Sequence, residues 1–489
     1  MAAGRMSVYI GNMPRLPRLS RETIVPLIVA CALFMQNVDS TVIATALPPI
    51  AAALHEDPLH LNLAITSYLL SLAIFIPLSG WTADRFGSRT VFRAAILVFT
   101  LGSVFCGMAT NLWELVLARI VQGMGGAMMV PVGRLVLLRA VPKSDLVRAM
   151  SMLTVPALLG PIMGPPLGGF IVTYASWRWI FFINVPFGII GMLLVNRFIA
   201  EVREETKAPL DMLGFALAGI GLATLMYGFE MAGRGMLGPA FATLLLASGV
   251  VLLGLYAFHA RHAAAPIIDL GLMRIPSFRG SILGSGVFRI GIEGLPFLMP
   301  MLFQLGFGLS PFRSGLLSFS TYAGAMTMKA AATPIIRTLG FRTVLVGNCA
   351  ICALFMLSYA LFRPTTSHLA IFLALLAGGF FRSLQVTSTN TLVFADVPQA
   401  LMSRATSFAS MAQQLWMSLG VGFSALFLHV VQMAKGGPLA APDFTPVFVI
   451  NSVIILAAIV VFARLPADVG SELSGHRPAA PEPESRPAE

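Results

Sequence analysis

Charged side chains inside long apolar stretches are the residues of this sequence best placed to do chemistry. Asp39 lies in the apolar stretch at 24–48, and Arg119 lies in the one at 112–138. At 1.5 Å per helical residue, Asp39 lies roughly 14 Å and Arg119 roughly 9 Å from the predicted outer ends of their helices. A charge in hydrocarbon costs at least ~2.5 kcal/mol, so such residues mark ion or substrate paths by default.

The Asp39 and Arg119 pair admits two interpretations. Desolvation and the neighbouring guanidinium act in opposite directions on the Asp39 carboxyl, so this group can load and release a proton as its access to water changes. The alternative is a permanent ion pair that only clamps two helices together. We predict that both residues take part in proton coupling.

A second pair of charges lies in the other half of the chain. Arg289 and Glu293 are four residues apart and therefore share one face of a helix. Arg289 lies roughly 16 Å from the predicted inner end, near the membrane midplane. Glu293 is predicted to act in coupling or in substrate binding, with a fixed ion pair to Arg289 as the alternative. With the amides Gln36 and Gln122, these two residues are assigned to the substrate cavity.

Two further cations, Lys329 and Arg382, lie in neighbouring apolar stretches of the second half. Their long side chains are able to extend toward the cytoplasmic surface.

The elements that must position these residues are membrane-spanning helices. Hydrophobic residues make up 57% of the 489 and charged residues only 11%, whereas a soluble globular protein has roughly 25% charged residues. A span needs about 20 apolar residues, and the sequence predicts an all-α polytopic membrane protein. Fourteen spans are expected at about 24–48, 61–82, 90–109, 112–138, 146–174, 177–200, 212–232, 238–260, 278–305, 311–336, 341–362, 366–391, 400–432 and 444–464.

The loop charges predict an orientation. With the N-terminus inside, the inner tails and loops hold 22 Lys and Arg residues and the outer loops hold five. This bias predicts that both termini lie on the cytoplasmic side of the membrane. The first apolar run contains Asp39 and has no small-residue cleavage site, so we interpret it as an uncleaved span. We expect 1–23 to be a cytoplasmic tail and 466–489 a disordered cytoplasmic tail.

An internal repeat divides the chain into two halves. The stretch Gly87-Ser-Arg-Thr-Val91 recurs as Gly340-Phe-Arg-Thr-Val344 at the same place relative to the spans. The repeat predicts two six-helix halves in parallel orientation, which is one way in which alternating-access transporters are built. The halves are expected at 24–200 and 278–465, and a linker at 201–277 carries the two inserted spans.

Five segments resemble motifs of the major facilitator superfamily and, more narrowly, of the fourteen-span drug:proton antiporter family. They are Asp39-Ser-Thr-Val-Ile-Ala-Thr-Ala-Leu-Pro48, Gly80-Trp-Thr-Ala-Asp-Arg-Phe-Gly-Ser-Arg89, Arg119-Ile-Val-Gln-Gly-Met-Gly-Gly-Ala127, Gly160-Pro-Ile-Met-Gly-Pro-Pro-Leu-Gly-Gly169 and Trp177-Arg-Trp-Ile-Phe-Phe-Ile-Asn-Val-Pro186. The resemblance implies the major facilitator fold and export of drug-like amphipathic compounds across the bacterial inner membrane in exchange for protons. It implies no cofactor, since the proton gradient supplies the energy.

The loop segment is expected to form a conformational latch that consists of Gly80, Asp84, Arg85, Gly87 and Arg89. An acid at a helix end gains from a neighbouring helix dipole, and the arginines are able to pair across the halves. The alternative is a basic loop that only sets the topology.

The antiporter motif consists of Gly160, Gly164, Pro165, Gly168 and Gly169. Glycines at four-residue spacing give a flat face for close helix packing, and the proline adds a kink. The resemblance implies control of proton leak here, while packing alone is the alternative.

Several classes of function are excluded. The sequence has no GxxxxGK[ST] phosphate loop, no HExxH and no nucleophile elbow, so we expect neither ATP-driven transport nor an enzyme. The four cysteines lie in apolar stretches without a second CxxC pair, and we expect no metal site. Scattered Lys and Arg exclude nucleic acid as a partner. The expected partners are an amphipathic small molecule, protons and lipid; nothing in the sequence supports a periplasmic adaptor.

Two rival functions stay open. One is a proton-coupled or facilitated transporter of a specific metabolite, and the other is a membrane sensor that transports nothing.

Overall fold

The protein was analysed as a computed structural model that describes residues 21–56, 62–142, 145–201, 209–233, 238–309, 311–437 and 439–474. Within these ranges every regular element is a helix, which confirms the predicted all-α class. The first half contains α1 (Arg21–Leu54), α2 (Asn62–Phe75), α3 (Leu78–Phe86), α4 (Ser88–Met108), α5 (Leu112–Ala140), α6 (Leu146–Tyr174), α7 (Trp179–Phe182) and α8 (Asn184–Phe198).

The remaining helices form the linker and the second half. The linker contains α9 (Met212–Gly233), α10 (Pro239–Ala260) and the short η2 (Leu270–Arg274). The second half contains α11 (Pro276–Ile292), α12 (Leu295–Met301), η3 (Leu302–Gly306), α13 (Pro311–Tyr359), α14 (His368–Leu392), η4 (Gln399–Leu401), α15 (Met402–Lys435), η5 (Ala441–Phe444), α16 (Thr445–Phe462) and α17 (Ser471–Ser474).

Most of these helices are long and apolar enough to cross a membrane. Eleven of the described helices pass that test, or twelve if α2 and α3, bent by 59° at their junction, form one span. The 49-residue α13 consists of two helices that meet at a kink at Gly340. The multi-pass membrane class is therefore confirmed, while the count of fourteen spans stays a prediction.

The internal repeat reappears as backbone geometry. Gly87, between α3 and α4, has φ 89° and ψ 139°, and Gly340, inside α13, has φ 73° and ψ 162°. Only glycine adopts such angles without steric strain, because it has no Cβ. The two glycines therefore make equivalent breaks between consecutive helices of the two halves.

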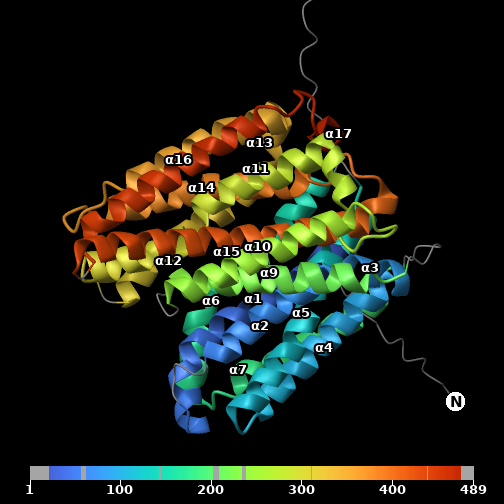
Figure 1. Cartoon of the computed structure of the whole chain (residues 1–489), viewed down its shortest axis with the longest axis horizontal. Helices are drawn as coiled ribbons and strands as arrows, with labels where there is room; N and C mark the ends of the chain where they lie inside the picture. The colour runs from blue at the N-terminus through green and yellow to red at the C-terminus, as the bar shows by residue number, and fades with distance from the viewer. Residues whose placement is uncertain are drawn as a thin grey trace, which may run out of the picture.

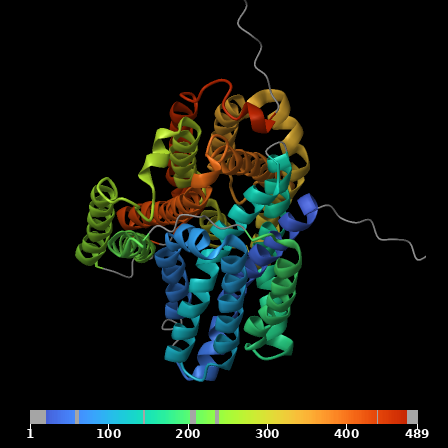
Figure 2. The same cartoon turned by 90° about the vertical axis from the view of Figure 1, so that its right-hand side faces the viewer.

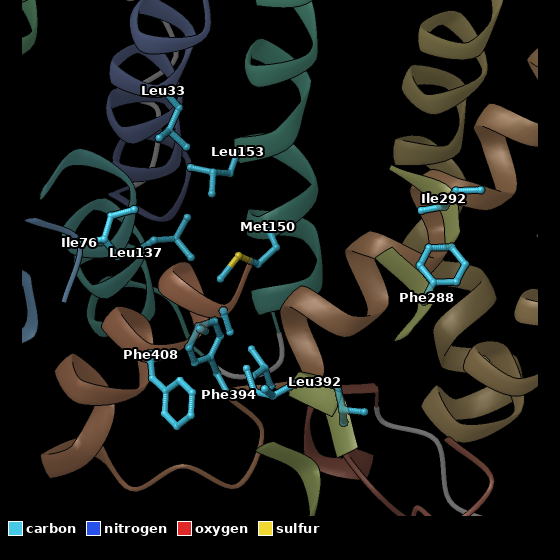
Figure 3. Packing of buried hydrophobic residues seen from close by; sticks show 14 of the residues in the cluster. Leu33, Ile76, Leu137, Met150, Leu153, Phe288, Ile292, Leu392, Phe394 and Phe408 are labelled. Atoms are coloured by element: carbon cyan, nitrogen blue, oxygen red, sulfur yellow. The ribbon is translucent and has the colours of Figure 1, made fainter. Parts of the chain in front are cut away.

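The two halves form separate bundles that converge at one end. They approach each other at the end where α3 lies and separate toward the end marked by α7 and α12 (Figure 1). Apolar side chains fill the converging end: Leu137 and Met150 of the first half lie near Phe394 and Phe408 of the second (Figure 3). By loop charge, this closed end is the predicted cytoplasmic side.

The inserted helix α9 bridges the halves, because it packs against both α2 and α15. Leu222 and Met226 of α9 lie in one buried cluster with Ala73 of α2, and Met411 of α15 packs against that cluster. The second inserted helix, α10, lies on α9 at the edge of the molecule (Figure 2).

The two ends of the described chain lie on the same side as the closed end. Val25 of α1 lies in a pocket with Arg139 at the end of α5, and Gly470 lies against Phe341 and Leu392. The predicted disorder of 466–489 is wrong for 466–474, where α17 forms and Leu473 is buried. Apolar side chains hold this short segment against the bundle; 475–489 and 1–20 lie outside the described residues.

Candidate coupling and substrate-binding sites

Asp39 and Arg119 form a fully buried ion pair between α1 and α5. Arg119 Nη1 donates to Asp39 Oδ2 at 2.6 Å and to Gln122 Oε1 at 2.7 Å. Gln122 Nε2 in turn donates to Asp39 Oδ1 at 2.8 Å. Arg119 and Gln122 have no exposed surface, and Asp39 is 4% exposed. Two of the three residues predicted to act in proton coupling are therefore in direct contact.

Two residues that sequence reasoning missed complete this cluster. Asn184 Nδ2 donates to Asp39 Oδ1 at 2.9 Å and lies 3.1 Å from Ser103 Oγ, which also accepts from Gln122 Nε2 at 2.7 Å. Asn184 belongs to the Trp177–Pro186 motif, which was a usable signal. Ser103 carries no such sequence signal, because serine is common in membrane helices. Asp39 thus has a guanidinium and two amides as donors.

Close packing of α5 against its neighbours gives the cluster its shape. A Cβ on Gly123 would lie 2.6 Å from the Ser71 Cβ, so α2 and α5 approach closely there. Ser71 Oγ also donates to the Ile120 carbonyl at 2.7 Å. The guanidinium of Arg119 then reaches α2, where Nε donates to the Ala64 carbonyl at 3.2 Å and Cζ lies 4.2 Å from the Tyr68 ring centroid.

A second ion cluster joins α11 to α14. Glu293 accepts from Arg289 Nη1 at 2.7 Å and from Arg382 Nη2 at 2.6 Å. The predicted Arg289–Glu293 pair is present on one helix face. Arg382 does not extend toward the cytoplasmic surface, because the buried Glu293 carboxylate holds it. Lys329 does not extend to the surface either. It is 9% exposed, and its ammonium donates to Thr387 Oγ1 at 2.6 Å.

A cavity of about 270 Å³ lies between the two halves. Gln36 and Arg289, two of the residues assigned from the sequence to a substrate cavity, line it together with Arg134, whose Nη2 donates to Gln413 Oε1 at 2.7 Å. Gln122 and Glu293 do not line it; they belong to the two ion clusters instead. Gly126 on the cavity wall lies against both Gln36 and the Tyr68 hydroxyl, so the Asp39 cluster lies one side chain behind the wall.

A larger cavity of about 650 Å³ adjoins this one, and the two share Gln414 and Met417. Its wall includes Thr66 and Leu69 at the start of α2 and Met301 at the end of α12. These positions belong to the end where the halves separate (Figure 1). The cavities thus extend toward the predicted outer side of the membrane.

The predicted latch residues lie at the closed end. Ser403 Oγ of α15 donates to Asp84 Oδ2 of α3 at 2.5 Å, which joins the halves. A Cβ on Gly80 would lie 2.9 Å from the Ser403 carbonyl oxygen, so the glycine allows this approach. Ser407 Oγ donates to the Ile76 carbonyl at 3.1 Å. Asp84 and Gly80 therefore lie at a contact between the two halves.

The arginines of that loop do not pair across the halves, contrary to the expectation. Arg89 Nη2 donates to the Asn196 carbonyl at 2.6 Å, within its own half. Arg85 lies 5.6 Å over the Trp81 ring in the same helix. The partners of both side chains lie within the first half. Gly87 forms the break between α3 and α4.

The antiporter motif packs α6 onto the segment of α1 that carries Asp39. A Cβ on Gly160 would lie 2.5 Å from the Asn37 Cβ, and one on Gly164 would overlap Thr41. Thr41 Oγ1 donates to the Gly160 carbonyl at 3.2 Å. Gly168 is buried, while the surroundings of Pro165 and Gly169 lie outside what the structure describes. Helix packing is the role that these contacts support directly.

No group of three or more His, Cys, Asp or Glu residues within the described ranges could hold a metal ion. The four cysteines are free, and Cys349 and Cys352 are buried in α13.

Comparison with known proteins gives consistent matches along the chain. The family model described as Major Facilitator Superfamily matches residues 29–421. The chain is 40% identical over 444 residues to the "Putative multidrug resistance protein MdtD" of Salmonella paratyphi A, which covers 90% of this chain and 94% of that protein. The protein of the same name from Salmonella typhimurium matches to the same extent.

Solved structures show the same fold. The human organic anion transporter MFSD10 superposes with a TM-score of 0.65 at 16% identity, over 92% of this chain and 100% of that one. The proton:xylose symporter XylE superposes with a TM-score of 0.65 at 16% identity, over 93% of this chain and 98% of that one.

Proposed function

Because the chain belongs to the major facilitator superfamily, we propose that it is a proton-driven exporter of amphipathic small molecules in the bacterial inner membrane. The proton gradient is its energy source, and no cofactor is needed. The name of its Salmonella relatives, a multidrug resistance protein, supports drug-like compounds as the substrate class.

The observation that carries this proposal is the buried Asp39–Arg119 ion pair. Asp39 is the one acid in a cluster whose other members are Arg119 and the neutral Gln122, Asn184 and Ser103. Ionised, Asp39 accepts from all three nitrogen donors. Protonated, it loses its charge, and Arg119 keeps only neutral partners. Since an unpaired charge is costly in hydrocarbon, loading a proton favours a different helix arrangement.

The position of the cluster supports a link to substrate binding. Gln36 and Asn37 of α1 line the smaller cavity, as do Gly126 and Ala127 of α5. Asp39 and Arg119 lie on the same two helices. A change in the distance between them moves two walls of the cavity, which is how a proton and a substrate bias the same equilibrium.

The second helix arrangement requires the latch at the closed end to open. The Ser403–Asp84 hydrogen bond and the apolar cluster of Figure 3 hold the predicted cytoplasmic end closed. Export requires that this end open to load substrate, so these contacts must break in each cycle.

The experiment is gradient-driven substrate movement in proteoliposomes, with binding measured separately. Asp39→Asn fixes a neutral side chain and should abolish uphill export while substrate still binds. Asp468→Asn, an exposed carboxylate outside the spans, is the matched control and should transport normally. Gradient-driven export that survives Asp39→Asn would rule out Asp39 as the proton site. Substrate and proton moving in the same direction would favour a metabolite symporter, and absence of any flux would favour a sensor.

A further inference from the structure

The smaller cavity between the halves carries an excess of positive charge. Arg134 and Arg289 lie in its wall, and Lys329 donates to Thr387, another wall residue. No Asp or Glu is among the described residues that line either cavity. Two carboxylates lie behind the wall, and both are already paired: Glu293 is shared between Arg289 and Arg382, and Asp39 is paired with Arg119.

Arg134 lines the cavity without an anionic partner among the described residues. It is 8% exposed, and its one hydrogen bond from the side chain goes to the neutral amide of Gln413. No ion pair joins it to an acid of the described residues. A buried guanidinium without a carboxylate is costly, because the desolvation of the charge is not repaid by a partner. An arginine in this position therefore indicates that its counter-ion comes from outside the chain.

A carboxylate or phosphate is the group that a guanidinium binds best, through two parallel charge-assisted hydrogen bonds. Amide side chains add neutral donors around the same space: Gln36, Asn390, Gln413 and Gln414 all line the cavity. A cationic head would instead meet two arginines and no acid. The charge of the wall thus selects anions.

The adjoining cavity fits the rest of an amphipathic molecule. Its wall is largely apolar and includes Leu70, Phe297, Met301 and Leu428. Methionine and aromatic side chains adapt to apolar groups of varied shape. Met226 and Tyr227 of the inserted helix α9 complete this wall, so the linker contributes to the site. Gln414 and Met417 belong to the walls of both cavities, so the two cavities adjoin there.

We propose that the exported compound is an amphipathic organic anion, with its carboxylate or phosphate head bound between Arg134 and Arg289 and its apolar part in the larger cavity beside α9. The proposal rests on the exporter function proposed above and narrows its substrate class.

The test is binding to the full-length protein in phosphatidylcholine nanodiscs at one pH and with no gradient. Three probes share a dansyl group on a six-carbon chain and differ only in the head, which is a carboxylate, a phosphonate or a trimethylammonium. Fluorescence anisotropy should show the two anions binding about tenfold or more tightly than the ammonium, as expected for a charge-assisted pair. Equal or tighter binding of the ammonium probe would overturn the proposal.

Variants locate the head group. Arg134→Gln should weaken carboxylate binding about tenfold, while Arg134→Lys, which keeps the charge, should recover part of it. Arg261→Gln, an exposed arginine outside the cavity, is the matched control and should bind within twofold of the native chain. Unchanged carboxylate affinity in Arg134→Gln would contradict the assignment. If Arg134→Gln does not fold, binding to Arg134→Lys and the three head-group probes on the native chain test the assignment instead.

Two further arms separate the remaining outcomes. Loss of probe binding when phosphatidylglycerol is added to the nanodisc would mean that a lipid headgroup, not a soluble anion, occupies the site. Anion binding without proton-driven exchange would overturn the exporter function and leave the anion site standing. Proton-driven exchange that prefers the ammonium probe would support the exporter function and overturn the anion site.

Discussion

Glu293 accepts a hydrogen bond from Arg382 at 2.6 Å, and this contact links α11 to α14 in the middle of the second half. The same carboxylate accepts from Arg289 at 2.7 Å, so one acid neutralises two arginines. Arg289 also lines the smaller cavity, so this cluster adjoins the cavity wall.

Replacement of Glu293 should therefore destabilise the protein more than loss of one hydrogen bond would. Glu293→Gln leaves the buried guanidinium of Arg289 and the partly buried one of Arg382 without an acid and should cost about 3–5 kcal/mol. The double variant Glu293→Gln with Arg382→Gln leaves one such guanidinium and should recover part of the loss. Thermal unfolding in detergent measures both. If Glu293→Gln is as stable as the native chain, water or lipid reaches this cluster freely.

The latch makes a kinetic prediction. Asp84→Ala removes the acceptor of Ser403 at the closed end and should slow turnover by several-fold, with substrate affinity unchanged within a few-fold, because it alters the balance of states and not the cavity. Ser403→Ala should act in the same direction. Initial rates in proteoliposomes over a range of substrate concentrations separate the two parameters. Loss of affinity at normal maximal flux would assign the loop another role.

The antiporter motif makes a packing prediction with an internal control. Gly164→Ala places a Cβ onto Thr41 and should force α6 away from α1, with loss of stability of about 1–3 kcal/mol and loss of coupled transport. Gly254→Ala, in α10, meets nothing within 4 Å and should be neutral. Thermal unfolding and gradient-driven transport report on both. Equal behaviour of the two variants would show that close packing at Gly164 does not matter.

The orientation is tested by cysteine labelling in intact cells with an impermeant thiol reagent, with the native chain as background. Glu56→Cys, after α1, should react from outside. Arg261→Cys, after α10, should react only after permeabilisation, because its loop belongs to the positively charged side. Labelling of Arg261→Cys in intact cells would reverse the assignment of both faces.

The sequence by itself determined the class of the protein and the residues of the Asp39–Arg119 pair. Charges are so costly in hydrocarbon that each one inside an apolar stretch stands out without any structure. Gly87 and Gly340 were found as a repeat for a related reason, since a break with positive φ between two helices restricts the residue to glycine.

The tertiary structure alone decided which side chains surround those charges. Hydropathy describes a helix along its own axis, whereas the rotation of a helix and the identity of its neighbours come from packing with distant segments. Ser103 and Asn184 join Asp39 only because α4 and α8 bring them there, and Gln122 turns to Asp39 and not to the cavity. Arg134 lies inside the predicted span 112–138, but only the structure shows that Gln413 of α15 contacts it and that it lines the cavity.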